Sequence, residues 1–345
     1  MQDDSLDQAL KVFPRATEND WKRAAKKESD GNDPFESLSW HTDDGILCLP
    51  YYEATSASNS SQTDNLATKS RWAWLNVPKV EKTSSIDEHV RNGAEGVVLD
   101  LRKYREIDPA SIPPSCPLLA FYIKPGFTTE AFRTLISGGR QIVWMWDGVP
   151  STEHIAAFAD AFHGIWVPPA TPAEEAASAL VSGIALFERL AEIFPAEDAF
   201  RKIRFSLPCN AKVVETVAKL RAMRSLWLHV ARVYGFELYK PEDVHLHARS
   251  SFAPDSSYGP QENMLKGTFS AIGAVLGGCD SLTVETEEEP AFARRWARNV
   301  SHILKAESFL DSTIDPLGGA HAVETLTEAL SQRAWQKFLE RLSTV

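Results

Sequence analysis

Polar side chains follow the short apolar runs of this sequence, at the positions where barrel enzymes place their chemistry if those runs are strands. They are Asn76, Lys79, Asp100, Arg102, Lys124, Asp147, Cys209, Asn210, Arg249, Ser250, Glu285 and Thr286. They contain no recognisable catalytic triad and no pair of acids suited to general acid–base work. We therefore expect most of them to cap helices and to form surface ion pairs.

His245 and His247 are two residues apart in one apolar run, so both imidazoles lie on the same face of the predicted strand. Some barrel metallohydrolases hold a divalent metal ion with this spacing. A metal site needs further ligands, and no other histidine or carboxylate has a diagnostic spacing from this pair. We expect no metal site, and a barrel hydrolase that binds a metal through these two histidines is kept as an alternative.

Tryptophans recur in the same runs. Trp72 and Trp74 share one face of a predicted strand, as do Trp144 and Trp146. We expect them to pack rather than to form a stacking platform, and if they and Trp166 point inward they fill the interior of a barrel. The acidic run 285–289 is typical of a solvated helix N-terminus rather than of a metal cluster.

These residues need elements that position them, and strand-like runs alternate with helical segments after Arg71. The predicted strands are 72–77, 95–101, 118–123, 141–146, 163–168, 202–208, 243–250 and 280–286, and the clearest helices are 172–194, 210–235 and 260–278. Eight strand–helix units predict an α/β protein with a (β/α)8 TIM-type barrel. An open doubly wound sheet is the alternative, but its G-x-G-x-x-G fingerprint and the phosphate-loop motif are absent.

The first 70 residues differ from the barrel segment, 71–345. They begin with a polar, helical stretch and end in the Ser-, Thr- and Asn-rich segment 54–70, which is typical of a linker. We expect residues 1–70 to be an extended, partly helical N-terminal arm. Because such an arm cannot bury enough surface alone, Phe13, Trp21, Trp40 and Tyr51 are predicted to contact another subunit.

Composition excludes several classes of protein. The net charge of −11 disfavours binding to nucleic acid or to anionic membranes. No apolar run approaches the ~20 residues that span a bilayer, and the acidic start MQDDSLDQAL is unlike a signal peptide. We therefore expect a cytoplasmic protein. Cys48, Cys116, Cys209 and Cys279 form no C-x-x-C pair and are expected to be buried.

The C-terminal third is more specific. Residues 295–320, RWARNVSHILKAESFLDSTIDPLGGA, resemble the signature of the methylmalonyl-CoA mutase family, in which an Arg-Ile-Ala-Arg-Asn helix precedes a paired acid and Asp-Pro-x-Gly-Gly-Ser. The matching positions are Arg295, Ala297, Arg298, Asn299, Glu307, Asp315, Pro316, Gly318 and Gly319, whereas Trp296, Val300, Ala306, Ser312 and Ala320 depart from it. Residues 214–227, VETVAKLRAMRSLW, resemble the family's Ala-Lys-x-Arg-Ala-x-Arg-x-Leu-Trp helix. Residues 13–27 and 38–52 resemble the N-terminal arm of its small subunit.

This resemblance implies an adenosylcobalamin-dependent isomerase that interconverts methylmalonyl-CoA and succinyl-CoA, with the pantetheine arm of CoA along the barrel axis. The family's cobalamin domain carries Asp-x-His-x-x-Gly, which is absent from this sequence as it ends at Val345. The family's Arg-Gln-Tyr-Ala-Gly-Phe and Ser-Gly-Tyr-His motifs are replaced here by SRWAWLNVP and HGIWVPPATPAEEAAS. The chain therefore looks closest to the non-catalytic small subunit, and we expect it to bind no cofactor alone.

Two hypotheses follow from the resemblance. The chain is either a small-subunit-like component beside a large catalytic mutase subunit, or an active acyl-CoA mutase barrel that works with a separate cobalamin-binding polypeptide. The signature residues are expected to be structural, with Asp315 as the partner of Arg298. Arg249, Ser250 and Ser251, at a strand end, are candidate acyl-CoA contacts.

Overall fold

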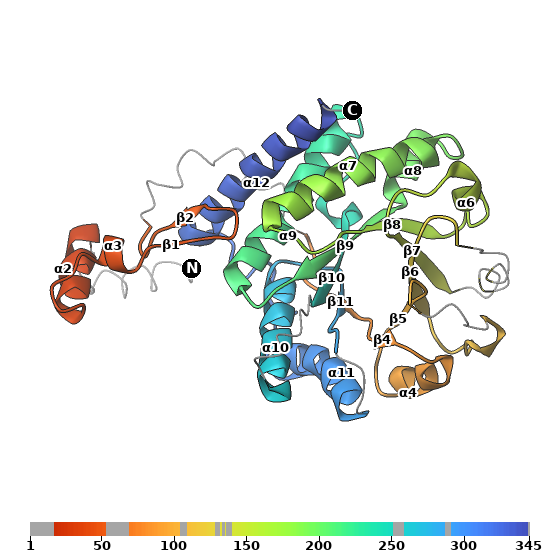
Figure 1. Ribbon diagram of the computed structural model, residues 1–345, viewed down its shortest axis with the longest axis horizontal. Helices are drawn as coiled ribbons and strands as arrows, with labels where there is room; N and C mark the ends of the chain where they lie inside the picture. Colours follow the sequence, from red (N-terminus) through yellow and green to blue (C-terminus); the bar gives the residue numbers. More distant parts are fainter. Residues whose placement is uncertain are drawn as a thin grey trace, which may run out of the picture.

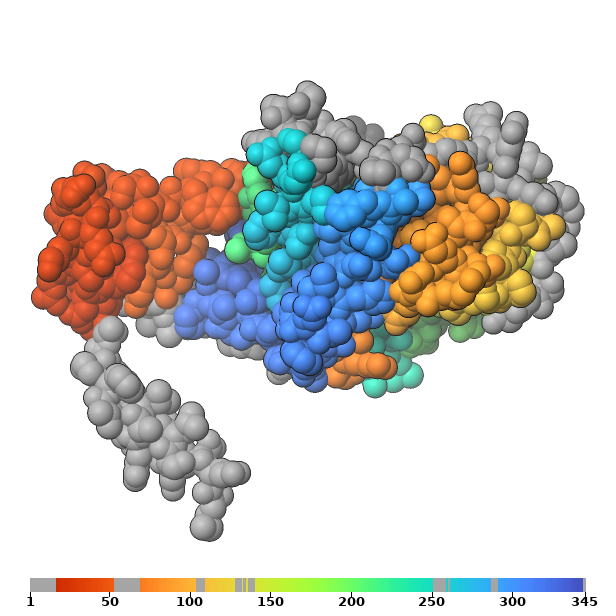
Figure 2. Space-filling view, turned by 90° about the horizontal axis from the view of Figure 1, so that it is seen from below, coloured from red at the N-terminus to blue at the C-terminus, as the bar shows by residue number. Residues whose placement is uncertain are grey.

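The structure of the chain is a computed structural model that describes residues 17–52, 69–103, 109–127, 132, 135, 140–250, 259–286 and 291–343. It contains a barrel and an N-terminal arm that projects from one side of the barrel (Figures 1 and 2). Among the described residues, no helix combines the length and the apolar character needed to cross a membrane.

The barrel is a parallel sheet that closes on itself. Its strand order is β3-β11-β10-β9-β8-β7-β6-β5-β4. The strands are β3 (Leu75–Asn76), β4 (Lys79–Val80), β5 (Val97–Asp100), β6 (Leu118–Ile123), β7 (Gln141–Trp146), β8 (Phe162–Trp166), β9 (Ile203–Cys209), β10 (His245–Ser250) and β11 (Ser281–Thr283). The two end strands, β3 and β4, are separated only by Val77 and Pro78 and form one segment. Because this segment bonds to β11 on one side and to β5 on the other, the nine strands fill eight barrel positions.

Helices cover the outside of this barrel. They are α4 (Ile86–Arg91), α6 (Thr152–Ala156), α7 (Pro172–Ala191), α8 (Ala196–Arg201), α9 (Val213–Val233), α10 (Pro260–Leu276), α11 (Ala291–Ala306) and α12 (His321–Leu342). α12 lies across α7 and α9, whereas α10 and α11 cover a separate stretch of the sheet (Figure 1). The predicted TIM-type barrel is confirmed, and each of the eight predicted strands is present.

Side chains alternate between the two faces of each strand. In β10, Leu246 and Ala248 point outward and join the apolar core beneath α7, α9 and α10. An inner cluster lies on the opposite face of the sheet and comprises Val77, Val98, Leu118, Ala120, Tyr122, Val143 and Met145, with Leu75, Phe162 and Trp166 packed against it. The sheet therefore separates an outer, helix-covered core from a filled interior.

Most of the tryptophans belong to the outer core. Trp144 and Trp146 pack with Phe158 outside the sheet. Trp74 donates a hydrogen bond to Ser301 Oγ of α11 (2.8 Å), and Trp72 donates one to Val275 O of α10 (3.0 Å). The tryptophan pairs pack, as predicted, but they point away from the axis, and among these residues only Trp166 borders the interior cluster. All four cysteines are buried, as expected.

The described part of the arm contains α2 (Glu18–Glu28), α3 (Pro34–Ser37) and a hairpin of β1 (Trp40–His41) and β2 (Leu47–Cys48). α2 buries none of its residues. Trp21 stacks on Tyr51 with ring centroids 5.2 Å apart and meets the edge of Phe35 at 5.4 Å. Two of the predicted anchors therefore contact each other within the arm, while Phe13 lies outside the described residues.

The hairpin attaches the arm to the barrel. Cys48 and Ile46 pack against α9 and α12. Asp44 accepts hydrogen bonds from Thr171 Oγ1 (2.5 Å) and from Ala173 N (2.9 Å) at the start of α7. The side chain of Thr171 does not cap α7, so the arm supplies the N-terminal cap of a barrel helix.

Candidate functional site

The C-terminal end of the barrel, with the interior beneath it, is the candidate site, because enzymes of this fold place their active sites at that end. Tyr122 of β6 and His247 of β10 lie on strands separated by three others, and the Tyr122 hydroxyl lies 3.0 Å from His247 Nε2. Such a contact spans the axis. His247 Nδ1 lies 2.8 Å from Ser281 Oγ, so both imidazole nitrogens are engaged within the interior.

A stack of two guanidiniums and one indole closes the C-terminal end of the interior. The Arg102 and Arg249 guanidinium carbons lie 3.9 and 4.2 Å from the centre of the Trp166 ring. Arg102 binds both carboxylate oxygens of Asp100 at 2.9 Å. Arg249 donates to Ser206 O (2.8 Å) and Ser206 Oγ (3.1 Å). Arg249 is thus held by the adjacent strand β9 and Arg102 by the end of β5, the strand that precedes it, whereas Trp166 Nε1 has no hydrogen-bond partner.

Burial determines the protonation of this interior. Burial lowers the pKa of His247 to about 3, and the neighbouring positive charge of Arg249 acts in the same direction. Burial also raises the pKa of Tyr122 above its ordinary range. Burial alone would raise the pKa of Asp100, but hydrogen bonds and charge from Arg102 outweigh it and lower that pKa. Near neutral pH the interior therefore contains a neutral imidazole, a neutral phenol and a paired carboxylate.

Several of the polar residues that were expected at strand ends lie together at this end of the barrel. Asp100, Arg102 and Asp147 form one ion-pair group, with Arg102 Nη1 3.4 Å from Asp147 Oδ2. Lys79 joins it with Nζ 3.8 Å from Asp100 Oδ2. The candidate Arg249 points inward, and the candidate Ser250 accepts a hydrogen bond from Glu285 N at 2.7 Å through its hydroxyl. Ser251 lies outside the described residues.

The histidine pair is divided between two environments. His247 is engaged by Tyr122 and Ser281, as described above, whereas His245 begins β10 at the opposite end of the barrel. Burial lowers the pKa of His245 to about 3 although Asp280 opposes this shift. Within the described ranges no group of three His, Cys, Asp or Glu side chains is arranged to hold a metal ion.

Helix α9 carries three basic residues of the family-like motif, and each holds a different part of the barrel. Lys219 pairs with Glu175 of α7 (2.5 Å) and also donates to Pro208 O of β9. Arg221 pairs with Asp315 and with Glu324 (2.6 Å). Arg224 donates to Pro241 O, Val244 O, Gly278 O and Asp280. α9 therefore ties together elements that are far apart in the sequence.

The signature residues lie on α11 and the loop that follows it, outside the barrel interior. Six are exposed: Arg295, Asn299, Glu307, Pro316, Gly318 and Gly319. The predicted pairing of Asp315 with Arg298 is wrong, because Asp315 binds Arg221 and Arg298 is buried against α4 instead. Gly319 has φ +78°, a conformation that side chains rarely adopt, and its N–H donates to Glu324 at 3.0 Å.

Trp166 was expected as one possible occupant of the interior, and it borders the inner cluster. Tyr122 was not expected there, because it stands inside an apolar run and carries no motif. Arg221 and Arg224 belong to a quoted motif, but no role was assigned to them. One signal was available, because arginines within an otherwise apolar helix are almost never buried without partners.

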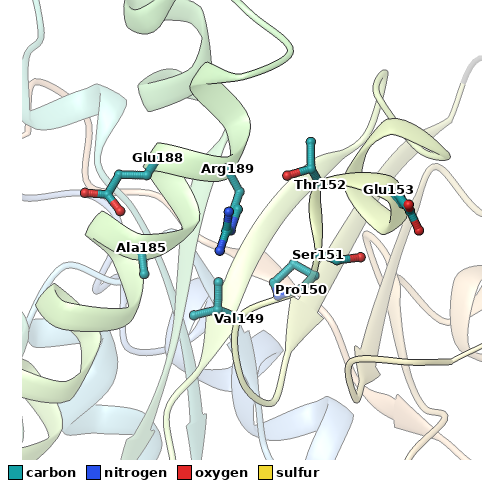
Figure 3. Close-up of a pocket in the computed structure, with 8 residues that line it drawn as sticks. All are labelled: Val149, Pro150, Ser151, Thr152, Glu153, Ala185, Glu188 and Arg189. Atoms are coloured by element: carbon teal, nitrogen blue, oxygen red, sulfur yellow. The ribbon is translucent and has the colours of Figure 1, made fainter. Parts of the chain in front are cut away.

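A surface pocket of about 660 Å³ lies between α7 and the segment 149–153, outside the barrel. Figure 3 shows Arg189 extending from α7 toward this segment, while Glu188 and Glu153 point away from each other. Arg189 pairs with Glu192 (3.2 Å), and Thr152 donates to Glu192 (2.7 Å). The polar side chains of Arg189 and Thr152 are thus already paired with Glu192, and we assign this pocket no function.

Comparison with known proteins agrees with the motifs. The family model for methylmalonyl-CoA mutase matches residues 142–342. A probable methylmalonyl-CoA mutase small subunit of Mycobacterium tuberculosis is 36% identical over 189 residues, which cover 52% of this chain and 30% of that protein. The methylmalonyl-CoA mutase small subunit of Propionibacterium freudenreichii is 24% identical, covering 95% of this chain and 62% of that protein. The chain thus spans less than two thirds of the length of either relative.

Proposed function

Because the chain belongs to the methylmalonyl-CoA mutase family, we propose that it is a small-subunit-like component that pairs with a larger catalytic mutase subunit. In this proposal its own barrel does not isomerise methylmalonyl-CoA. The relatives called small subunits support the pairing. The single observation that carries the proposal is the filled interior of the barrel.

A CoA thioester that lies along a barrel axis needs an open channel lined by small side chains. Here the axis is crossed by the Tyr122–His247 contact, and Trp166 lies between Arg102 and Arg249. Tyr122, His247 and Arg249 are at most 2% exposed. Opening a channel would break hydrogen bonds that satisfy buried polar groups, and each broken bond costs about 1–3 kcal/mol. The filled axis therefore favours a scaffold over an active barrel.

Adenosylcobalamin is the cofactor of the family, and the described interior does not fit it. Both nitrogens of His247 are hydrogen-bonded, and His245 lies at the other end of the barrel. The family's Asp-x-His-x-x-Gly motif is absent from the sequence. We therefore derive no chemical step through this cofactor, and we propose that the chain alone does not bind it.

The arm supports a partner subunit. Four large apolar side chains of the hairpin region are exposed, namely Leu38 (50%), Trp40 (42%), Leu47 (50%) and Leu49 (38%). We call this set the hairpin patch. It belongs to the hairpin region, which joins the arm to the barrel through Asp44, Ile46 and Cys48. Interfaces are enriched in aromatic anchors of this kind, and we propose that the partner subunit covers the patch.

Co-expression with a full-length mutase subunit tests the proposal. We expect an affinity-tagged chain to recover that subunit in a 1:1 complex, and the isolated chain to show no isomerase activity with added adenosylcobalamin. The rival function, an active barrel with a separate cobalamin-binding polypeptide, predicts turnover once that polypeptide is added in place of the large subunit. Turnover of that kind, or no complex with the large subunit, would overturn the proposal.

A further inference from the structure

The seam between α4 and α11 contains a buried arginine that nothing in the proposed function uses. One contact joins the two helices, and a second ties α11 to β3. His302 Nε2 of α11 lies 3.1 Å from Asn92 O at the end of α4, and Arg298 O accepts a hydrogen bond from Asn76 Nδ2 at 3.1 Å. Because Arg298 precedes His302 by one turn and His89 precedes Asn92 by about one turn, the side chains of Arg298 and His89 face the same stretch of the seam.

Arg298 is only 4% exposed, yet its Nε and Nη1 atoms have no hydrogen-bond partner. His89 is 2% exposed, and its Nδ1 atom also has none. Buried guanidinium groups normally bind a carboxylate, a phosphate or carbonyl oxygens. In the same structure, Arg224 and Arg249 each donate several hydrogen bonds. Arg298 is therefore an exception among the described buried arginines of this barrel.

The electrostatics of the seam favour an anion. Burial, together with the charges of Arg298 and Arg294, lowers the pKa of His89 to about 4 although Glu88 opposes this shift. Burial also lowers the pKa of Arg298, and Glu88 opposes this shift without a hydrogen bond to it. Arg294, Arg298 and His302 recur every four residues along α11, so three basic side chains lie on one face of the helix.

We infer that this seam, the site of Arg298 and His89, binds an anionic oxygen group, either a phosphate or a carboxylate. Nη1 and Nη2 lie side by side at the end of a guanidinium and can donate to two oxygens of one anion. Nε and Nη1 are enclosed and unpartnered, whereas Nη2 is not among such atoms. We therefore expect an anion to reach Arg298 from the side of Nη2. Neutral His89 can donate through Nδ1. The inference does not depend on the subunit role proposed above.

Titration of the full chain tests this inference, with inorganic phosphate and sodium acetate as separate probes and chloride at matched ionic strength as the reference. We expect a saturable rise in Tm, matched by calorimetric binding of one anion per chain, with at least one probe. A stronger response to phosphate identifies a phosphate site, and a stronger response to acetate identifies a carboxylate site.

Substitution then assigns the site. Arg298→Gln should weaken the apparent affinity by about tenfold or more, the loss expected for one charge-assisted hydrogen bond. Arg295→Gln, on the exposed face of α11, is the matched control and should leave the affinity unchanged. His89→Leu should weaken it severalfold. Equal affinity in wild type and Arg298→Gln would overturn the inference. So would the absence of a saturable response of the wild-type chain to either probe, and this second test does not depend on whether a variant folds.

Discussion

The barrel and the arm differ in how far they bury their side chains and in how many partners those side chains have. The barrel encloses charged residues such as Arg224 and Asp280 and gives each of them several partners. The arm leaves Trp40 and Leu47 about half exposed, and α2 buries none of its residues. The filled axis leaves the barrel interior complete without a ligand, whereas the seam at Arg298 and His89 leaves buried polar atoms unpartnered. We propose that a partner covers the apolar side chains that the arm exposes, although barrel residues such as Leu265, Phe292 and Phe309 are exposed as well.

Removing a buried charge from the barrel is expected to have the largest effect on stability and so tests this comparison most strongly. Arg224→Met removes the Arg224 donor from three buried carbonyl groups and one of the donors to Asp280, so we expect the free energy of unfolding to fall by about 3–5 kcal/mol, or the chain not to fold. Urea unfolding followed by circular dichroism measures the loss. Arg295→Met, at an exposed position, should change it by less than about 0.5 kcal/mol. Similar losses in the two variants would contradict the account of the barrel.

The second largest effect concerns the pH dependence of stability, to which a buried histidine of the barrel should contribute. Burial lowers the pKa of His163 to about 4, so the folded barrel keeps it neutral while the unfolded chain protonates it near pH 6.5. Because the unfolded state then binds more protons, stability must fall as the pH falls below about 6.5, by about 2 kcal/mol for this residue between pH 7 and pH 5.

Unfolding midpoints of the wild type at pH 7 and pH 5 measure this loss. His163→Asn should reduce the pH dependence by the same amount of about 2 kcal/mol. A pH dependence that is undiminished in His163→Asn would show that this histidine does not contribute to it.

The junction between the regions should have an intermediate effect. Asp44→Ala removes the cap that the hairpin supplies to α7, and we expect a loss of about 1 kcal/mol. Asp43→Ala is the neighbouring control, because Asp43 forms an exposed ion pair with Lys212 and such pairs contribute about 0–1 kcal/mol. Chemical denaturation of both variants compares them, and an Asp44→Ala variant as stable as wild type would mean that the hairpin does not hold α7.

The smallest effect on stability is expected in the hairpin patch. The double variant Trp40→Ser, Leu47→Ser should change the free energy of unfolding by less than about 0.5 kcal/mol. It should nevertheless weaken partner binding by at least about tenfold, because aromatic anchors dominate interface energies. Denaturation and pull-down of the large subunit measure the two quantities. Undiminished partner binding would place the interface elsewhere.

The barrel could be predicted from the sequence because the eight apolar runs and their helices alternate regularly. The first strand was expected to be continuous, but it is divided into β3 and β4 around Pro78, which has no N–H to donate to a neighbouring strand. The occupants of the interior could not be predicted, since both faces of a buried parallel strand are apolar and the face of Trp144 or Trp166 cannot be read from periodicity. The pairing of Arg221 with Asp315 joins residues 94 positions apart, and no local pattern encodes it.

The filled barrel axis is the central claim, and calorimetric titration of the isolated chain with methylmalonyl-CoA tests it most directly. A chain whose axis holds Tyr122, His247 and Trp166 should bind no thioester beyond the level seen with free CoA, and Trp166→Ala, which removes the largest side chain of the stack, provides the comparison. The account predicts no saturable binding to the wild-type chain. Saturable micromolar binding of methylmalonyl-CoA, lost when Arg249 is replaced, would contradict it and would favour an active barrel.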